Sequence, residues 1–277
     1  MLKFGSKGAE VETLQRLLNA AGANVKTDGW FGTATEKAVR EFQAAATPPL
    51  VADGIAGAQT LAALQGRRTP DMLDQTAIES AAALLGVEVA AVMAVSRVEA
   101  QGRGFLSDGR VKILFERHIF YRELQKKHGD AEAEFWARQA PHICSKSPGG
   151  YKGGPAEYPR FSRAFAIDAD CAMKSCSWGA YQIMGFNHRQ AGFKTVGEMV
   201  DAVKTGENAQ LMAFAAFIKA DKAMHAALVK KDWPDFARRY NGPAFKDNDY
   251  DTKLAKAYDH FAKVYPVKEV ADVADVA

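Results

Sequence analysis

One segment of the chain is apolar on nearly every side of the helix that it predicts. Residues 87–98 read V-E-V-A-A-V-M-A-V-S-R-V, and a glycine-broken stretch follows directly after Glu99. A helix without a broad polar face has to be enclosed by other elements, because no side of it faces water at low cost. The chain must therefore build a core around this helix, and Glu99 lies where the helix leaves that core.

This position predicts an unusual carboxyl group at Glu99. Burial disfavours the charged form and raises the pKa, and the negative end of the helix dipole acts in the same direction. A carboxylic acid that stays protonated near neutral pH can protonate a leaving-group oxygen, which is how glycoside-cleaving enzymes use one of their acids. We therefore expect Glu99 to be catalytic.

Composition limits the classes of protein that can contain such a site. The 277 residues leave room for two domains, and 48% hydrophobic with 25% charged residues is ordinary for a soluble globular protein. A net charge of +3 is far from that of a typical nucleic-acid binder. No apolar run approaches the roughly 20 residues that span a bilayer, and the N-terminus lacks the apolar centre of a signal peptide. We expect a monomer made in the cytosol, with no nucleic-acid partner and no stable membrane insertion.

The three cysteines do not predict a disulfide framework or a cofactor. Cys144, Cys171 and Cys176 are few and unevenly spaced, which favours free buried thiols. A bridge between Cys171 and Cys176 is one alternative, and a zinc site that adds His142 is another. The H-x-C and C-x4-C spacings are not common for zinc ligands, so we expect no metal and no cofactor.

A short internal repeat organises the first 65 residues. Residues 28–39 and 53–64 both read D-G-x-x-G-x-x-T and then continue into a helical pattern. An Asp-Gly turn, a second glycine that allows close backbone approach and a helix opening near the threonine account for this pattern. With an amphipathic helix over residues 11–18, the repeat predicts a small three-helix bundle over residues 1–65.

The remaining chain predicts a larger, mainly α domain. Residues 66–72 have the composition of a linker, residues 73–267 form the domain, and residues 268–277 form a tail. A strand is expected over residues 109–116 and a glycine- and tyrosine-rich loop over residues 148–159. The expected helices cover residues 76–85, 87–98, 119–127, 131–140, 195–203, 208–219, 222–230, 233–240 and 251–264.

Two further segments are polar and contain glycine where their flanks are apolar. Residues 177–185 read S-W-G-A-Y-Q-I-M-G, which places Ser177, Tyr181 and Gln182 in a setting suited to stacking and hydrogen bonding with a sugar. Residues 238–243 read R-R-Y-N-G-P and present Tyr240 and Asn241 at the end of a helix. We expect these five residues to bind substrate.

Residues 1–65 resemble the small three-helix peptidoglycan-binding domain of many wall hydrolases. The resemblance rests on G-x-x-G-x-x-V-x-x-L-Q-x-x-L, D-G-x-F-G-x-x-T-x-x-A-V-x-x-F-Q and D-G-I-x-G-x-x-T-L. It implies that peptidoglycan is the partner. The candidates for the wall-facing surface are Asp28, Trp30, Phe31, Asp53 and Ile55.

The larger domain resembles goose-type lysozymes and lytic transglycosylases, and more closely the N-acetylmuramidase family of phage endolysins. The blocks are V-E-A-Q-G-R-G-F, D-G-R-V-K-I-L-F-E-R-H, S-W-G-A-Y-Q-I-M-G and R-R-Y-N-G. The resemblance implies a lysozyme-like α-rich fold with a short β element, and Glu99 as the acid. It also implies cleavage of the β-1,4 bond between N-acetylmuramic acid and N-acetylglucosamine during host-cell lysis. Such an enzyme is made in the host cytosol and acts on the wall, in the periplasm, after membrane permeabilisation.

Several features leave the mechanism open. Residues 100–178 separate Glu99 from the Gly-Gln block, an insertion relative to compact transglycosylases, and Ala100 replaces their usual serine. No aspartate stands at a clear nucleophile position. Glu116 is the candidate second carboxylate, although beside Arg117 and His118 it also fits a structural ion pair. Without a second acid, the muramic acid's own 6-hydroxyl or acetamido oxygen attacks, as in a lytic transglycosylase that forms 1,6-anhydro products. A non-catalytic wall-binding protein is the further alternative.

Overall fold

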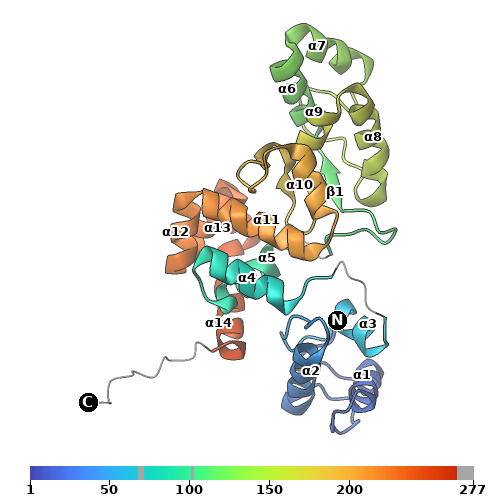
Figure 1. Ribbon diagram of the computed structural model, residues 1–277, viewed down its shortest axis with the longest axis vertical. Helices are drawn as coiled ribbons and strands as arrows, with labels where there is room; N and C mark the ends of the chain where they lie inside the picture. Colours follow the sequence, from blue (N-terminus) through green and yellow to red (C-terminus); the bar gives the residue numbers. More distant parts are fainter. Residues whose placement is uncertain (68–71, 101–102, 267–277) are drawn as a thin grey trace, which may run out of the picture.

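The computed structural model describes residues 1–67, 72–100 and 103–266, and these residues are mainly helical (Figure 1). Two separate hydrophobic cores are present. The smaller contains Leu14, Leu18, Phe31 and Val39, and the larger begins at Ala77 and continues into the last helix. The described residues form helices and a single three-stranded sheet, which confirms the expected mainly α fold class.

The N-terminal bundle consists of α1 (Ala9–Ala20), α2 (Thr33–Ala45) and α3 (Ala58–Leu64). Gln15 is buried on α1, and its amide donates to the Asp28 carboxylate while its carbonyl accepts from the Asp28 and Gly29 amides. One buried glutamine thus satisfies the backbone of a whole turn, and α2 repeats the arrangement for the second copy. This explains why a Leu-Gln and a Phe-Gln pair accompany the repeat.

The apolar helix is enclosed as expected. Helix α5 (Val89–Glu99) buries every residue from Ala90 to Ser96, with α4 (Gln75–Leu85) and α14 (Tyr250–Val264) packed against it. Gly86 ends α4 in the left-handed region at φ 64°, which lets the chain turn directly into α5. Each buried Val or Met side chain contributes roughly 1.5–3 kcal/mol relative to exposure.

The residues between Glu99 and the Gly-Gln block form a lobe at the top of Figure 1. Its sheet has the order β1-β2-β3, with both pairs antiparallel. The expected strand over residues 109–116 is shorter in the structure, with a ladder only at β1. The elements are β1 (Ile113–Phe115), α6 (Arg117–His128), α7 (Asp130–Gln139), η1 (Gly154–Ala156), α8 (Glu157–Ile167), α9 (Ala169–Lys174), β2 (Cys176–Trp178) and β3 (Ile183–Met184).

The expected loop over residues 148–159 is partly wrong, because α8 begins inside it. Glu157 and Arg160 are both buried on α8 and pair with each other, and the Glu157 carboxylate also accepts from the Lys152 and Gly153 amides. Burial of charged residues by mutual pairing gives no apolar period, so the sequence pattern could not reveal this helix.

The remaining helices agree with the sequence expectations to within a few residues at their ends. Thr195 and Glu198 form a capping box at the start of α10, which fixes that end. The elements are η2 (Gly185–Asn187), α10 (Val196–Val203), α11 (Glu207–Ala220), α12 (Lys222–Lys230), α13 (Trp233–Asn241) and η3 (Pro243–Asn248). The tail 268–277 lies outside the described residues, as does part of the linker.

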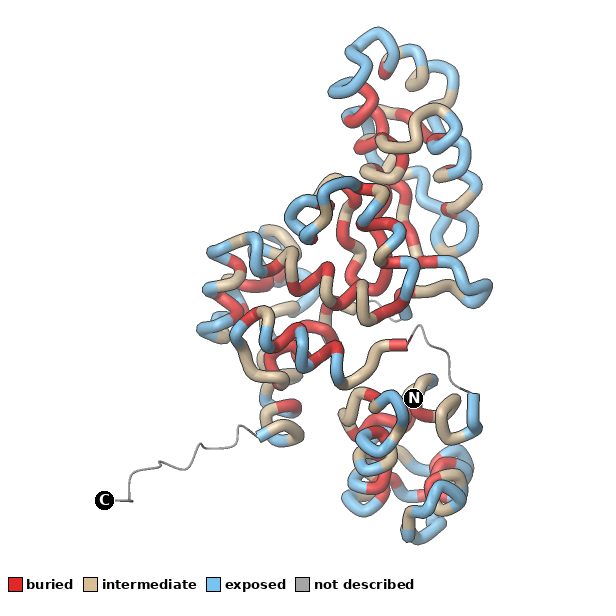
Figure 2. Tube along the Cα trace, in the orientation of Figure 1, coloured by how far each residue is buried: buried red, intermediate tan, exposed pale blue. Residues whose placement is uncertain are grey.

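Buried residues concentrate at the centre of the larger domain, where α4, α5 and α11 meet (Figure 2). The three cysteines are free and buried, with Cys144 against α7, Cys171 on α9 and Cys176 on β2. No single helix among the described residues is long and apolar enough to cross a membrane; α4 and α5 together would pass on length and composition, but they are bent by 109°.

Candidate active site

Glu99 is the last residue of α5 and is only 6% exposed. The Asn241 amide, at the end of α13, donates to Glu99 Oε1 at 3.0 Å. Burial raises the pKa of Glu99 to about 7, an effect that the Asn241 hydrogen bond opposes. A carboxyl group with this pKa is protonated in about half of the molecules at neutral pH and can therefore donate a proton.

Two tyrosines connect the helices on which Glu99 and Asn241 lie. Tyr240 donates to the Tyr181 carbonyl at 3.0 Å, and the Tyr181 hydroxyl lies 2.8 Å from Ser96 Oγ, one turn before Glu99. Burial raises the pKa of both phenols, so they remain neutral. Tyr181 is only 4% exposed and stacks on Phe214. The expectation that Tyr181 contacts substrate is therefore wrong, because its side chain is part of the scaffold.

Gln182 lies in the tight turn between β2 and β3. It has a left-handed backbone with φ 49°, a conformation that costs a non-glycine residue energy and is concentrated at functional sites. Ser177 Oγ donates to Gln182 Oε1 at 2.8 Å, and Gln182 Nε2 donates to the Gly179 carbonyl at 2.7 Å. The half-buried amide is thereby oriented, with one N–H and one lone pair beyond these two contacts. Ser177 itself is buried and acts on Gln182.

Glycine is required in this turn because another side chain fills the space beside it. A Cβ on Gly179 would lie 2.6 Å from Gln210 Oε1, and the Gln210 carbonyl accepts the Ala180 amide at 2.8 Å. Gln210 comes from α11 and also donates to the Val203 carbonyl. The turn is thus locked onto the helical part of the domain.

Glu116 lies at the end of β1 that is away from the Gly179 turn. The amide of Gly179 pairs with the Lys112 carbonyl at one end of β1, whereas the Glu116 amide pairs with the Ser175 carbonyl at the other end. Lys112 and Glu116 are four residue steps apart along the strand, roughly 13 Å.

Glu116 has its own partners in the upper lobe. Tyr151 donates to Glu116 Oε2 at 2.7 Å, and His118 Nδ1 lies 3.2 Å from the same oxygen without hydrogen-bond geometry. Among the described residues, no hydrogen bond or ion pair joins Glu116 to the surroundings of Glu99. These contacts fit the structural alternative better than a second catalytic carboxylate.

Glu207, at the start of α11, connects the chain after Glu99 to the rest of the molecule. Its Oε1 accepts the Gly104 amide at 3.0 Å, and its Oε2 accepts Gln59 Nε2 at 3.0 Å and the Leu73 amide at 3.3 Å. Three segments far apart in sequence meet on one buried carboxylate. Sequence patterns missed this residue because a glutamate in the first turn of a helix is common for dipole reasons alone.

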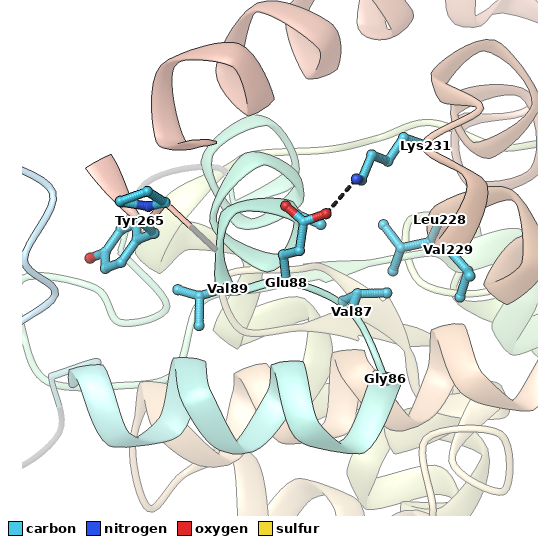
Figure 3. A pocket seen from close by; sticks show the side chains of 10 residues that line it. Gly86, Val87, Glu88, Val89, Leu228, Val229, Lys231 and Tyr265 are labelled. Atoms are coloured by element: carbon cyan, nitrogen blue, oxygen red, sulfur yellow. Dashed lines mark ion pairs between the residues drawn. The ribbon is translucent and has the colours of Figure 1, made fainter. Parts of the chain in front are cut away.

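A cavity of about 600 Å³ lies at the opposite end of α5 from Glu99 (Figure 3). Leu228, Val229 and Tyr265 line it, and Glu88 pairs there with Lys231. The eleven residues of α5 place this cavity roughly 15 Å from Glu99. It is therefore not part of the site around Glu99.

Comparison with known proteins identifies the larger domain. The family model described as N-acetylmuramidase matches residues 88–262, more than half of the chain. The chain belongs to the N-acetylmuramidase family. A second model, described as a putative peptidoglycan binding domain, matches residues 7–64.

A solved structure also resembles the muramidase closely. The crystal structure of Burkholderia AP3 phage endolysin is 46% identical, with a TM-score of 0.88 over 95% of this chain and 99% of that one. No curated protein matches the chain significantly. These findings confirm the expectation of a peptidoglycan-cleaving endolysin that acts on the cell wall.

The muramidase exposes only part of the surface that was expected to face the wall. Trp30 is 43% exposed, with Lys7 over its ring at 4.2 Å, and Asp28 beside it is exposed. Phe31 is 0% exposed and lies in the core of the bundle, so its expected role at the surface is wrong. Asp53 and Ile55 lie in the second copy of the repeat and face the larger domain.

In the part of the chain that the structure describes, one group of side chains has the spacing of a metal site, namely Asp168, Asp170 and Cys171. Its members have other partners. The Asp168 carboxylate pairs with Lys127 and His128 and caps α9, which together hold its pKa well below the usual range. Burial raises the pKa of the Cys171 thiol to about 12, so it is not a ready thiolate ligand.

Proposed function

We propose that the muramidase cleaves the β-1,4 bond between N-acetylmuramic acid and N-acetylglucosamine, with Glu99 as the proton donor, and so lyses the host cell. The observation that carries this proposal is the buried carboxyl group of Glu99, whose pKa is about 7 and whose orientation is set by Asn241. Donation of its proton to the glycosidic oxygen releases the N-acetylglucosamine hydroxyl and leaves an oxocarbenium-like centre on muramic acid.

In the second step, in which a nucleophile attacks the muramic acid, Glu99 accepts a proton. After donation Glu99 is a carboxylate, and no other carboxylate among the described residues hydrogen-bonds to it or to Asn241. It can therefore take a proton from water as the water attacks, which gives a reducing sugar. It can equally take the proton of the muramic acid's own 6-hydroxyl, which gives a 1,6-anhydro product. The position of Glu116 at the far end of β1 favours this transglycosylase reaction as the second candidate.

Substrate contacts in this proposal come from groups with spare hydrogen-bonding capacity. Gln182 offers its remaining N–H to a sugar hydroxyl or acetamido carbonyl, and Asn241 keeps a second N–H beside Glu99. Ser177 and Tyr240 position these groups. Ser177 orients the Gln182 amide, and Tyr240 joins the end of α13 to the Tyr181 carbonyl.

The decisive variant is Glu99→Gln, which keeps the shape and the Asn241 contact but cannot donate a carboxylic proton. We expect a loss of about 10³-fold in turnover, within the range for a general acid. The control is Glu116→Gln, which should retain most activity. Lysis of outer-membrane-stripped Gram-negative cells measures both, and mass spectrometry of the products separates reducing from 1,6-anhydro ends. Substantial lysis by Glu99→Gln would overturn the proposal.

The pH dependence tests the same carboxyl group from another direction. The acid must be protonated to act, so the turnover number should fall as pH rises through about 7. Asn241→Ala removes the hydrogen bond that lowers the pKa of Glu99, so the alkaline fall should move to higher pH. A profile that is flat between pH 6 and 8 in the wild type would contradict this assignment.

A further inference from the structure

A cleft of about 710 Å³ lies between the N-terminal bundle and the larger domain. The bundle contributes the chain near Lys3 and Phe4 together with the second repeat, and the larger domain contributes α5 and α14. This volume is in the usual range for sites that bind small molecules or short peptides. The cleft is separate from the cavity in Figure 3.

One face of α14 forms the long wall of this cleft. Tyr250, Lys253, Ala257 and His260 follow one another at the spacing of three or four residues that lines up side chains on one side of a helix, and Lys256 extends the same face. Tyr250 and Ala257 are half-buried, whereas Lys253, Lys256 and His260 are exposed. The wall therefore has an apolar floor and a cationic rim.

The charge in the cleft is strongly one-sided. Lys3, Arg97, Lys253 and Lys256 line it, against one lining carboxylate, Glu36, which has Arg40 at 3.4 Å. Arg97 also interacts with the nearby Asp53 carboxylate, so the lysines carry most of the excess charge. Among the described residues, the lysines of this set form no ion pair. An excess of cations along one open cleft attracts an anion.

Apolar groups in the cleft set a second requirement for the ligand. Phe4 is exposed at the rim, and Ile55 and Phe261 lie deeper. A ligand that satisfies both sets of groups has carboxylates and aliphatic carbon within one short chain. The stem peptide of peptidoglycan has this chemistry, since it combines free carboxylates with alanine methyls and aliphatic chains.

The cleft begins at the end of α5 that bears Glu99. Arg97 lines the cleft and precedes Glu99 on α5 by two residues, which places the two side chains on nearly opposite sides of the same helix end. A helix with its side chains is about 10–12 Å across, and a stem of four residues extends up to roughly 14 Å from the sugar that bears it. A peptide on a glycan strand bound at Glu99 therefore has the length to pass the end of α5 and enter the cleft.

We propose that this cleft binds the acidic stem peptide of the peptidoglycan strand that is being cleaved. The proposal rests on the proposed function, because the same strand has to pass Glu99. It assigns Lys253 and Lys256 to the peptide carboxylates and Phe4 to the aliphatic part. It also gives the interface between the two domains a role in choosing strands that bear peptides over bare glycan.

The first experiment measures peptide binding without any cleavage. The full-length protein is titrated in a calorimeter with the free acidic stem tetrapeptide, and with the same peptide after amidation of its carboxylates. The test variant combines Lys253→Glu and Lys256→Glu. The control combines Lys222→Glu and Lys230→Glu on α12, which changes the net charge equally at exposed positions away from the cleft.

We expect the wild type and the control to bind the acidic tetrapeptide, and the test variant to bind it at least about tenfold more weakly. Amidation should weaken binding to the wild type to a similar extent. Absence of binding to the wild type, or equal losses in the two double variants, would overturn the proposal. So would tighter binding of a short oligonucleotide at the same cleft, since the ligand would then be a different class of polyanion.

The second experiment compares turnover on peptidoglycan that bears peptides with turnover on glycan strands stripped of them. The test variant should lose about tenfold in kcat/KM on the first substrate and nothing on the second, whereas the control should lose nothing on either. Equal losses on both substrates would contradict a peptide site. If the wild type cleaves neither glycan, the proposed function fails, and the titration still decides whether the peptide binds.

Discussion

The two copies of the D-G-x-x-G-x-x-T repeat have the same local structure and opposite surroundings. In each copy, a buried glutamine donates to the aspartate of the turn at 3.0 Å, as Gln15 does to Asp28 and Gln43 does to Asp53. Asp28 is exposed, and its pKa is lowered, chiefly by the hydrogen bond from Gln15. Asp53 lies between the domains, and burial raises its pKa.

One substitution between the copies contributes to this difference. The position before the repeat threonine is Ala34 in the first copy and Gln59 in the second. Gln59 donates to Glu207, which also holds the Gly104 amide after Glu99, whereas Ala34 is exposed. A motif that specifies a turn can therefore serve two purposes: one copy leaves a surface for the wall, and the other fixes the bundle to the catalytic domain.

The largest expected effect tests whether the two turns are equivalent. Gln15→Ala and Gln43→Ala each remove several buried hydrogen bonds, which should cost about 3 kcal/mol of bundle stability. A core of this size supplies only about 3–5 kcal/mol, so the bundle should open in both variants. Hydrogen exchange of residues 9–64 measures this opening, with the exposed Gln139→Ala as the control. Unchanged protection in either variant would show that its glutamine does not organise the turn.

The next effect concerns the attachment of the second copy. Gln59→Ala makes the second copy resemble the first and removes a hydrogen bond to a charged group, worth about 1.5 kcal/mol. Hydrogen exchange of the Gln75 amide, which donates to the Pro49 carbonyl of the bundle at 3.1 Å, should then become about tenfold faster, since it follows the population of the open form. Ala34→Gln, the reverse exchange in the first copy, should leave this rate unchanged. Equal rates in all three proteins would remove the distinction between the copies.

The surface of the first copy gives a smaller effect on binding. Trp30→Ala deletes the exposed ring of the first copy and should weaken binding to purified peptidoglycan about fivefold, while the bundle stays folded. Phe135→Ala is a matched control, because Phe135 is equally exposed on α7 of the other domain. Pelleting of the protein with insoluble peptidoglycan measures both, and parallel losses would place wall binding elsewhere.

The smallest effect is the opposite pH dependence of the two aspartates. The raised pKa of Asp53 means that its charge costs stability above that pKa, so Asp53→Asn should stabilise the protein slightly at pH 7. The gain should vanish below about pH 3.8, where the aspartate is protonated in both states. The lowered pKa of Asp28 stabilises above pH 3.8 and loses this effect as pH falls, so Asp28→Asn should destabilise at pH 7. Urea unfolding at pH 7 and at a pH below about 3.8 measures both changes. If the copies do not differ, the two substitutions will change the free energy of unfolding in the same direction.

The strongest sequence expectations came from patterns that are complete within a short stretch. Helix α5 was predictable because it is apolar on every side, and the turns at Asp28 and Asp53 because Asp-Gly and glutamine recur. Helix α8 was not, because the buried pair Glu157 and Arg160 looks like two surface charges in the sequence. Phe31 and Tyr181 were assigned to contact surfaces for their residue types, and packing placed both in the interior.

The sequence by itself determined most of the helices, the two domains' families and the placement of an acid at the end of a buried helix, since these depend on neighbours along the chain. Only the tertiary structure decided what surrounds that acid. Asn241 reaches Glu99 across 142 residues, and Glu207 reaches Gln59 across 148. Burial and hydrogen bonding set the pKa of a carboxyl group. Both depend on contacts between residues that are far apart in the sequence, which no local pattern contains.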